Sequence, residues 1–435
     1  MAIALGKFKE VSPARLAAFN ILQQVEAGAF SSILLAAEEP KLQPADRALC
    51  HELVLGVLRR QLFLDKIIEH SSKRRIESLD SAVRIALRLG LYQLRFLTRI
   101  PASAAVNESV SLVRAARLSS ATAFVNAVLR RAIREAEYDP TAQVSDALEK
   151  IAVQTSHPVW LIERWAKAFG IAEAEAFAQA NNVVPPTAFR VVTTRADQAD
   201  VLAKLRQAGA TIEQSQVAEE AWRVSGATTV LRELSTAGQV YLQDEASQLV
   251  AQMLDVKPGE RVLDLCAAPG GKTTLIADRA RNEATIIAAD RSATRMETVI
   301  ATSSLHELKA ITPVILDAAE QLPFKPGVFD KVLVDAPCSG TGTLRRNPEI
   351  RWRLSAVDID TFAEKQKQIL SRAADAVKPD GRLVYSTCSV EREENEAVIH
   401  ETLARDKRFH LLDSQRTWPQ RQGCDGFFIA ILQIR

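Results

Sequence analysis

From about Gln243 to the carboxyl terminus, short apolar runs alternate with helical patterns, and this alternation restricts the fold more than any other feature. Strands that alternate with helices form a parallel, doubly wound sheet, which binds its ligands at the carboxyl ends of the strands. A final run, GFFIAILQI, follows directly on the short strand FHLLD, so we expect it to be antiparallel. The five preceding apolar runs are RVLDLC, TIIAAD, TPVILD, KVLVDA and GRLVYST.

The residues before Gln243 have two other patterns. Up to about Tyr138, apolar residues recur with the period of a helix, and the pattern predicts five helices and no strand. After a further helix at 157–170, residues 183–238 mix short strands and helices, which predicts a small α/β unit. We therefore expect a multidomain chain with an all-α domain (1–140), a helical linker plus small α/β subdomain (141–238) and an α/β, Rossmann-like domain (239–435).

The composition is that of a globular protein. The chain has 435 residues, of which 47% are hydrophobic and 25% are charged. No apolar run approaches the roughly 18 residues needed to cross a membrane, and residues 1–10 carry no signal-peptide pattern. We expect a cytoplasmic monomer. The five cysteines include no CxxC pair and the six histidines are scattered, so we expect neither a disulfide framework nor a metal site.

Arginine is concentrated in two segments. Residues 81–134 contain nine arginines and a single acid, Glu108, and the segment TLRRNPEIRWRLS adds four arginines and a tryptophan. Arginine favours contact with phosphate, and a tryptophan ring can stack on a base, although a solvated helix face and helix packing are the alternatives. We expect an RNA surface that includes Arg84, Arg88, Arg130, Arg131, Arg345, Arg346, Arg351 and Trp352.

The stretch VLDLCAAPGGKTTLIADRA is a strand, a glycine turn and a helix, and it predicts a cofactor site. A phosphate-binding P-loop is disfavoured because Cys266 stands where its first glycine is required, and the GxGxxG of nicotinamide dinucleotide sites is absent. S-adenosylmethionine remains, since it needs no full phosphate cradle. Its predicted contacts are the turn residues Cys266, Ala267, Ala268, Pro269, Gly270, Gly271 and Lys272, Asp290 for the ribose, Asp317 for the adenine, and Asp335.

Two further strands each end in a cysteine, in DAPCSGTG (Cys338) and YSTCSV (Cys388). Together with LDLCAAPGGKTT, in this order, they resemble the RNA 5-methylcytosine methyltransferases of the bacterial Sun/Fmu (RsmB) type, which act on 16S ribosomal RNA. The resemblance covers the whole chain. PASAAVNESVSLVR and FVNAVLRRAIRE resemble a NusB-type RNA-binding domain, and the small α/β unit would be RRM-like. The family commonly has a proline after the second cysteine motif, where this chain has EREENEAVI.

The chemistry of that family explains the cysteines. A thiolate that adds to C6 of cytosine makes C5 nucleophilic toward the methyl group of S-adenosylmethionine. Spacing alone leaves open which cysteine attacks, and DNA cytosine methyltransferases use the one in the Pro-Cys motif. The resemblance implies that Cys388 is the nucleophile, that Cys338 assists product release, and that Asp335 contacts N3 and the exocyclic amine. It also implies that ribosomal RNA is the substrate.

Two other functions fit parts of the pattern. A non-catalytic RNA-binding or antitermination factor would need the helical domain but not the paired cysteines. A transfer-RNA or DNA methyltransferase would share the chemistry, and the helical domain favours ribosomal RNA over these only by resemblance. The alternative role for Asp317 is that of a helix cap or turn residue, and Cys266 and Cys424 match no catalytic role.

Overall fold

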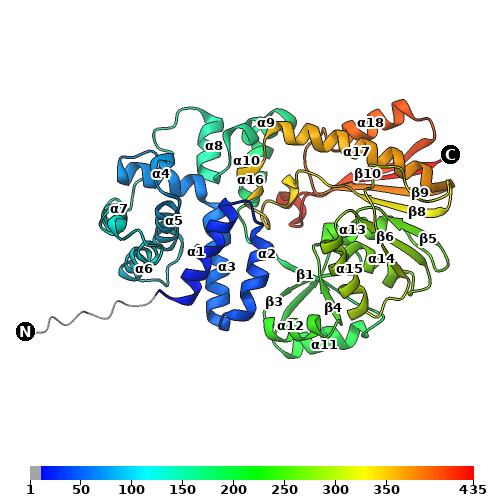
Figure 1. Cartoon of the computed structure of the whole chain (residues 1–435), viewed down its shortest axis with the longest axis horizontal. Helices are drawn as coiled ribbons and strands as arrows, with labels where there is room; N and C mark the ends of the chain where they lie inside the picture. The colour runs from blue at the N-terminus through cyan, green and yellow to red at the C-terminus, as the bar shows by residue number, and fades with distance from the viewer. Residues whose placement is uncertain (1–10) are drawn as a thin grey trace, which may run out of the picture. The chain divides into compact units, whose positions relative to one another are not determined.

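The computed structural model describes residues 11–435, and the first ten residues, where no signal peptide is expected, lie outside the described residues. The chain forms two compact units (Figure 1). The helical unit comprises the chain up to Val183 together with the segment Leu344–Arg353. The sheet unit comprises Val184–Thr343 and Leu354–Arg435. The predicted domain ranges are a different, finer division and stay predictions.

The helical unit is built from consecutive helices. The predicted helices correspond to α1, α3, α5, α6 and α7, whereas α2 and α4 were missed. Helix α4 begins where α3 ends, with Arg60 between them and no glycine or proline to mark the boundary. The helices are α1 (Pro13–Glu26), α2 (Ser31–Glu38), α3 (Pro44–Arg59), α4 (Gln61–Ser72), α5 (Ser81–Phe96), α6 (Ala102–Ala115), α7 (Thr122–Arg134), α8 (Ala147–Thr155), α9 (Val159–Phe169), α10 (Ile171–Ala180) and α16 (Ile350–Arg353).

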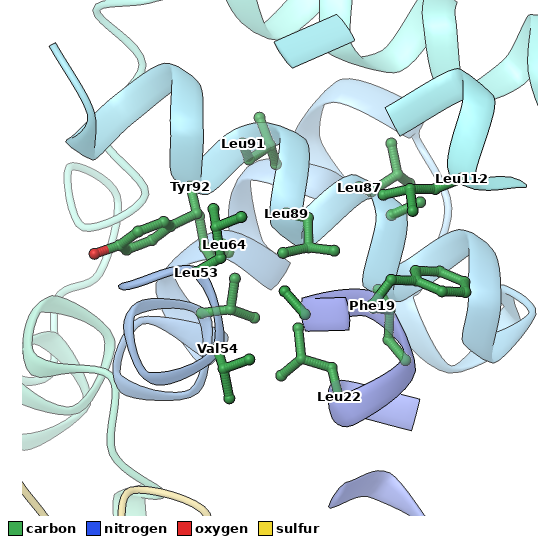
Figure 2. Close-up of a cluster of buried hydrophobic side chains, with 14 of the residues drawn as sticks. Phe19, Leu22, Leu53, Val54, Leu64, Leu87, Leu89, Leu91, Tyr92 and Leu112 are labelled. Carbon is green, nitrogen blue, oxygen red and sulfur yellow. The ribbon is translucent and has the colours of Figure 1, made fainter. Parts of the chain in front are cut away.

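Helix α5 is the centre of the hydrophobic core of this unit (Figure 2). Leu87, Leu89 and Leu91 are each fully buried although they alternate along the chain, so α5 is covered on several sides. A helix that is apolar all round must be enclosed by its neighbours. Gly56 of α3 allows the closest approach, because a Cβ atom there would lie 2.0 Å from the ring of Tyr92.

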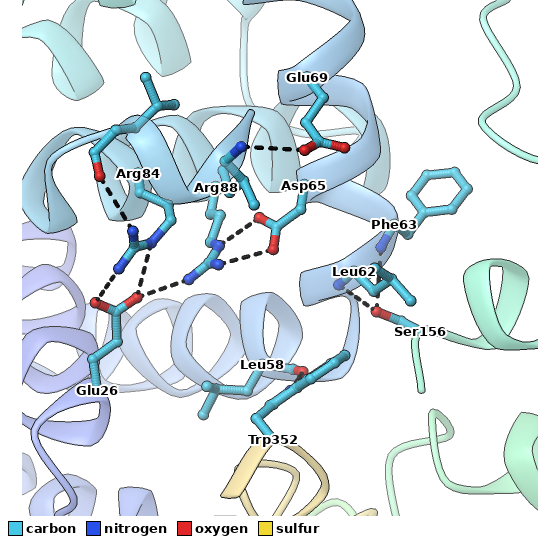
Figure 3. Close-up of polar contacts among 12 residues, drawn as sticks. Glu26, Leu58, Leu62, Phe63, Asp65, Glu69, Arg84, Arg88, Ser156 and Trp352 are labelled. Atoms are coloured by element: carbon cyan, nitrogen blue, oxygen red, sulfur yellow. Dashed lines mark hydrogen bonds and ion pairs between the residues drawn. The ribbon is translucent and has the colours of Figure 1, made fainter. Parts of the chain in front are cut away.

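The segment Leu344–Arg353 is held in the helical unit by hydrogen bonds. The carboxylate of Glu349 accepts from the backbone N–H of Ser31 at 2.8 Å. The indole Nε1 of Trp352 donates to the carbonyl of Leu58 at 3.0 Å (Figure 3). The guanidinium of Arg351, which is fully buried, donates to the backbone carbonyl of Ser156 at 3.1 Å and to Asn182 Oδ1 at 3.0 Å.

The first part of the sheet unit is a small four-stranded antiparallel sheet. Its strands are β1 (Thr187–Val191), β2 (Thr211–Gln214), β3 (Ala221–Ser225) and β4 (Val240–Leu242), in the order β2-β3-β1-β4. Helices α11 (Gln198–Gln207) and α12 (Thr228–Thr236) complete a βαββαβ unit. The predicted small α/β unit is therefore present, although α12 and β4 were not recognised in the sequence.

The second part is a seven-stranded sheet of the order β10-β11-β9-β8-β5-β6-β7. Its strands are β5 (Arg261–Asp264), β6 (Thr285–Asp290), β7 (Ile311–Ile315), β8 (Phe329–Asp335), β9 (Val377–Thr387), β10 (Phe409–Arg416) and β11 (Phe428–Ile434). The five strands β5 to β9 are parallel, and β11 is antiparallel to both β9 and β10, which confirms the predicted direction of the last strand.

Helices cover both faces of this sheet (Figure 1). On β8, Val332 and Val334 pack in the cluster that includes the long helix α17, whereas Leu333 packs in the cluster that includes α13 and α14. This alternation follows from the two-residue period of a strand. The helices of this part are α13 (Glu245–Met253), α14 (Gly271–Arg279), α15 (Ala293–Leu305), α17 (Ala356–Ala376), α18 (Glu396–Arg405) and α19 (Pro419–Gln422).

No helix within residues 11–435 is both long enough and apolar enough to span a membrane.

Candidate active site

The two cysteine motifs meet at the carboxyl edge of the sheet. Strands β8 and β9 are parallel neighbours, and their register places Asp335, the last residue of β8, opposite Ser386. Cys338 follows β8 by three residues and Cys388 follows β9 directly. The two sulfur atoms lie 3.2 Å apart, and both thiols are free. Two cysteines that are 50 residues apart in the chain therefore form one pair.

Asp335 is held between two donors beside the thiols. The hydroxyl of Ser386 donates to its Oδ1 at 2.8 Å, and the ammonium of Lys272 donates to its Oδ2 at 2.6 Å. Lys272 comes from the first turn of α14, and its Nζ also lies 5.2 Å from the centre of the Phe427 ring. The carboxylate and the ammonium are fixed in direction, because each has a close partner.

Burial and close partners change the pKa of two groups in the site. The hydrogen bond with Cys388, together with burial, raises the pKa of Cys338 well above the ordinary value for a thiol. Burial by itself would lower the pKa of Lys272, but Asp335 and then Cys388 more than offset it, so that this pKa is raised. The ammonium of Lys272 therefore stays charged beside Asp335.

The two cysteine loops are also joined through their backbones. The N–H of Gly342 donates to the carbonyl of Cys388 at 2.9 Å, and the N–H of Gly426 donates to the carbonyl of Gly342 at 2.8 Å. A Cβ atom on Gly342 would lie 1.8 Å from the carbonyl oxygen of Gly426. Gly342, the second glycine of GTG, is therefore required because three chain segments approach each other closely at this point.

The glycine turn lies between β5 and α14 as predicted. Gly270 is the N-cap of α14 with φ +105°, and a Cβ atom there would lie 3.2 Å from the Cα of Val299. Asp264, the last residue of β5, is buried and accepts a hydrogen bond from Thr273 Oγ1 at 2.7 Å. Burial raises the pKa of Asp264 to about 7.

Asp290 ends β6 and braces the same turn. Its Oδ2 accepts from the backbone N–H of Ala268 at 3.3 Å, and its Oδ1 accepts from that of Ser292 at 3.0 Å. Arg295 lies 3.7 Å from the same carboxylate. Asp317 follows β7, accepts from the N–H of Ala319 at 3.0 Å and keeps 39% of its side chain exposed. The expected turn role of Asp317 is thus present together with an accessible carboxylate.

A cavity of about 200 Å³ connects the glycine turn to the cysteine pair. Of the predicted cofactor residues, Cys266, Ala268, Asp290, Asp317 and Asp335 line it, whereas Ala267, Pro269, Gly270, Gly271 and Lys272 are not among its lining residues. Eight of the fifteen lining residues were not among the predicted site residues, and the lining set in full is Leu265, Cys266, Ala268, Asp290, Arg291, Arg295, Asp317, Ala318, Asp335, Ala336, Pro337, Cys338, Lys365, Ile369 and Cys388.

These residues fit S-adenosylmethionine. Carboxylates end or follow two consecutive strands on one side of the cavity, and apolar side chains such as Ala318 and Ile369 supply a surface for a purine ring. Within residues 11–435, no group of three or more His, Cys, Asp or Glu side chains is arranged to hold a metal ion.

The structure corrects part of the predicted RNA surface. Arg88 is 5% exposed, and its guanidinium forms a two-pronged pair with Asp65 at 2.7 and 2.9 Å and a further pair with Glu26 at 2.9 Å (Figure 3). Burial by itself would lower the pKa of Arg88, but Asp65 and Glu26 more than offset this effect, so the pKa is raised above its ordinary value. Arg84 also contacts Glu26, at 3.0 Å. Arg88 is therefore almost entirely buried and its guanidinium is already paired with two acids.

The second arginine segment is corrected in the same way. Arg345 is 3% exposed and Arg351 is fully buried, and burial together with nearby arginines lowers the pKa of Arg351 to about 9. Trp352 uses its indole N–H inside the helical unit, as described above. Arg345 and Arg351 are thus buried within one unit, whereas Trp352 is half-buried and lines a cavity of that unit, so its contact with RNA stays a prediction.

Two predicted arginines remain accessible. Arg130 is exposed on α7, and its Nε donates to Asn126 Oδ1 at 3.0 Å within the same helix. Arg131 on the same helix pairs with Glu135 at 3.0 Å and keeps 30% of its side chain exposed. Arg346 is half-buried. Contact between these three residues and RNA stays a prediction.

Three descriptions of known protein families match successive parts of the chain. Residues 12–134 match the NusB family. Residues 157–231 match a domain described as Methyltr_RsmF/B-like, ferredoxin-like, and residues 251–433 match the family described as 16S rRNA methyltransferase RsmB/F. The middle match agrees with the βαββαβ order of the small sheet.

Whole proteins match over almost their full length. The chain is 32% identical to the probable ribosomal RNA small subunit methyltransferase B of Bacillus subtilis, which covers 98% of this chain and 99% of the relative. It is 36% identical to the ribosomal RNA small subunit methyltransferase B of Pseudomonas putida, over 96% and 98% of the two chains. The solved structure of PH0851 is 28% identical, with a TM-score of 0.85 over 98% of this chain and 100% of that one.

Proposed function

Because the chain belongs to the ribosomal RNA small subunit methyltransferase B family, we propose that it methylates C5 of a cytosine in 16S ribosomal RNA through a covalent bond between Cys388 and C6 of the base. The observation that carries the proposal is the 3.2 Å contact between the sulfur atoms of Cys338 and Cys388, beside the Lys272–Asp335 pair. Two adjacent thiols next to a fixed carboxylate suit a reaction in which one thiol adds to the base and must later leave.

The methyl donor of this family is S-adenosylmethionine, which supplies an electrophilic methyl group. Asp290 and Asp317 would hold its ribose and adenine ends, and Ala318 and Ile369 would enclose the purine. The cavity continues from these residues to Cys338 and Cys388. A cytosine bound at the cysteine end would then lie next to the donor, as methyl transfer to C5 requires.

Cys388 is the nucleophile in this proposal. The raised pKa of Cys338 keeps that thiol protonated, which suits a role in product release, and the charged ammonium of Lys272 interacts with Cys388. The sulfur of Cys388 adds to C6, and the proton that this thiol gives up reaches N3 by way of Asp335, which also accepts from the exocyclic amine; protonation at N3 draws electron density from the ring. C5 thereby becomes nucleophilic and accepts the methyl group.

Cys338 acts in the second half of the reaction. The C5 proton must be removed before the bond between Cys388 and C6 can break. Water accepts the C5 proton, and the protonated thiol of Cys338, which contacts the sulfur of Cys388 and lines the same cavity, donates its proton to that sulfur as its bond to C6 breaks. In the absence of Cys338 we expect the methylated base to stay attached to Cys388.

The target base must be unstacked to reach the thiols, so a loop or bulge of the RNA is the expected site. Arg130 and Arg131 on α7 would contribute phosphate contacts that are independent of sequence. Asp335 would favour cytosine over uracil because only cytosine carries an exocyclic amine at C4.

The test compares the wild type with Cys388→Ala and Cys338→Ala, with Cys50→Ala as the matched control because Cys50 is a buried thiol of the helical unit. Each protein is incubated with S-adenosylmethionine and unmodified 16S RNA, methyl transfer is counted, and covalent protein–RNA adducts are resolved on a denaturing gel.

We expect Cys388→Ala to give neither product nor adduct, Cys338→Ala to accumulate adduct, and Cys50→Ala to behave as the wild type. The reverse pattern for the two site variants would assign the attack to Cys338. Absence of methyl transfer by the wild type on this RNA, with no adduct in any variant, would overturn the proposal.

A further inference from the structure

Each cysteine of the pair is followed by a serine, and the two serines are also in contact. The hydroxyl oxygens of Ser339 and Ser389 lie 3.0 Å apart. Both residues are buried, at 5% and 0% exposure. The serine contact repeats, one residue further along each loop, the 3.2 Å contact of Cys338 with Cys388. The loop that contains Cys338 and Ser339 and the loop that contains Cys388 and Ser389 are therefore in contact at two successive positions.

Both serines donate to one carboxylate, that of Glu394. The hydroxyls of Ser339 and Ser389 each donate to its Oε2. The backbone N–H of Ser339 donates to Oε1 at 2.8 Å, and Gln366 of α17 donates to the same oxygen at 3.1 Å. Glu394 is fully buried, and these four donor groups, on three residues, are all neutral. Burial raises the pKa of this carboxyl above its ordinary value.

The neighbours of Glu394 extend the same connection to the strand ends. Gln366 also donates to the carbonyl of Pro337 at 2.9 Å, which fixes the loop just before Cys338. The phenol of Tyr385, in β9, donates to the carbonyl of Glu394 at 2.6 Å. On the other side, Asn395 donates to the carbonyl of Ser389 at 2.9 Å. Glu394 thus lies at the centre of a bonded path that joins the two cysteine loops.

We propose that Glu394 is a positioning residue that holds the Cys338 loop against the Cys388 loop and so keeps the two thiols in contact. A carboxylate suits this position because it offers two oxygens and several acceptor sites, enough for two hydroxyls and two N–H groups at once. An amide offers one acceptor oxygen, and an alanine offers none. The contact of the thiols is independent of the proposed reaction, whereas the effect on catalysis rests on the proposed function.

The first test measures the thiol contact directly and needs no substrate. The full-length reduced protein is treated with diamide, an azo compound. One thiolate adds to the N=N bond, and the second displaces the resulting hydrazide, so that an S–S bond forms while diamide is reduced to the hydrazine. Disulfide formation between Cys338 and Cys388 is followed by alkylation and peptide mass mapping.

The variants are Glu394→Ala and Glu394→Gln, with Glu364→Gln as the matched control, since 68% of the Glu364 side chain is exposed on α17. We expect disulfide formation to be at least about tenfold slower in Glu394→Ala, the change that corresponds to loss of one charge-assisted hydrogen bond. Glu394→Gln is expected to be intermediate, and the control is expected to match the wild type.

Wild-type closure rates in Glu394→Ala would overturn the proposal, and so would a wild type in which the two cysteines do not close at all. Circular dichroism establishes that each variant is folded. If Glu394→Ala does not fold, Glu394→Gln and Ser389→Ala carry the same comparison, since Ser389→Ala removes one of the two hydroxyl donors.

The second test uses methyl transfer to 16S RNA. In Glu394→Gln we expect kcat to fall with little change in KM for S-adenosylmethionine, and the fraction of trapped protein–RNA adduct to rise, because Cys338 is no longer held at Cys388. An unchanged kcat and adduct fraction would contradict the catalytic consequence. If the wild type itself transfers no methyl group, the proposed function fails, while the disulfide result still decides the role of Glu394.

Discussion

The sheet edge and the helical unit both contain charged pairs, but the pairs differ in what they face. In the pair of Lys272 with Asp335, 13% and 24% of the two side chains are exposed, and Asp335 lines the cavity next to both cysteines. In the pair of Arg88 with Asp65, 6% and 11% are exposed, and Arg88, although it lines a cavity of the helical unit, is bonded to two acids, Asp65 and Glu26. The open pair, Lys272 with Asp335, can act on a ligand at the thiols, whereas the enclosed pair, Arg88 with Asp65, stabilises the fold.

The strongest test of this difference is to remove the negative charge from the open pair. We expect Asp335→Asn to lower kcat/KM for methyl transfer by about 10³-fold, as for loss of a group that takes part in proton transfer. Its thermal unfolding midpoint is expected to change little, since the amide still fits between Ser386 and Lys272. Steady-state methyl counting measures the effect, and Glu283→Gln, at an exposed acid of the same unit, is the control. Wild-type kcat/KM in Asp335→Asn would contradict the assignment.

The enclosed pair should show the opposite result. We expect Arg88→Met to destabilise the helical unit by about 3–5 kcal/mol, because it leaves the buried Asp65 without its cation. Urea unfolding followed by the helical circular dichroism signal measures the change. Arg130→Met, at an exposed arginine, is the matched control, with an expected effect within about 0.5 kcal/mol. Equal effects of the two substitutions would show that burial does not distinguish these arginines.

A third kind of buried charge is that of Asp264, which accepts from Thr273 and lies next to the cofactor turn. Its folded pKa of about 7 is above the ordinary value of 3.8. Stability from this group is therefore fully present below pH about 4 and is lost as the pH rises to about 7.

In Asp264→Asn this pH dependence should be absent. We expect the variant to gain on the order of 2 kcal/mol relative to the wild type between pH 5 and pH 8. Thermal unfolding at a series of pH values measures the difference. A constant difference between the two proteins across that range would mean that Asp264 does not titrate in the window assigned to it.

The smallest expected effect belongs to the exposed arginines. Arg130→Ala should weaken RNA binding about two- to fivefold and should reduce the slope of log affinity against log salt by about one, the values for loss of one phosphate contact. Filter binding at several salt concentrations measures both. Arg281→Ala, at an exposed arginine of the sheet unit, is the control, and an unchanged slope in Arg130→Ala would remove this residue from the RNA surface.

Much of the sheet unit was predictable because its information is local. The strand positions follow from apolar runs, and the motif residues Asp335, Cys338 and Cys388 stand at strand ends, where parallel topology places them on one edge. The role of Glu394 was not predictable. It lies 55 residues from Ser339, and only folding shows that the two serines share its carboxylate.

The burial of Arg88, Arg345 and Arg351 was missed for the same reason. Residues 81–134 contain one acid, so the segment looks strongly basic in isolation. The acids that pair with Arg88 are Asp65 and Glu26, which lie 23 and 62 residues away. Charge counted along a sequence window therefore overestimates the charge that a folded surface presents.

The segment Leu344–Arg353 has a consequence for how the protein is made. The helical unit is the first to emerge during synthesis, and domains generally fold in that order. Its buried Arg351 and the Trp352 indole nevertheless belong to a stretch that begins some 160 residues after Val183. At about 5–20 residues per second the ribosome needs roughly 10–30 s to supply it. During this interval the carbonyl groups of Leu58 and Ser156 lack the donors that Trp352 and Arg351 provide in the finished protein. The helical unit can therefore be completed only after the first strands of the sheet unit have been synthesised.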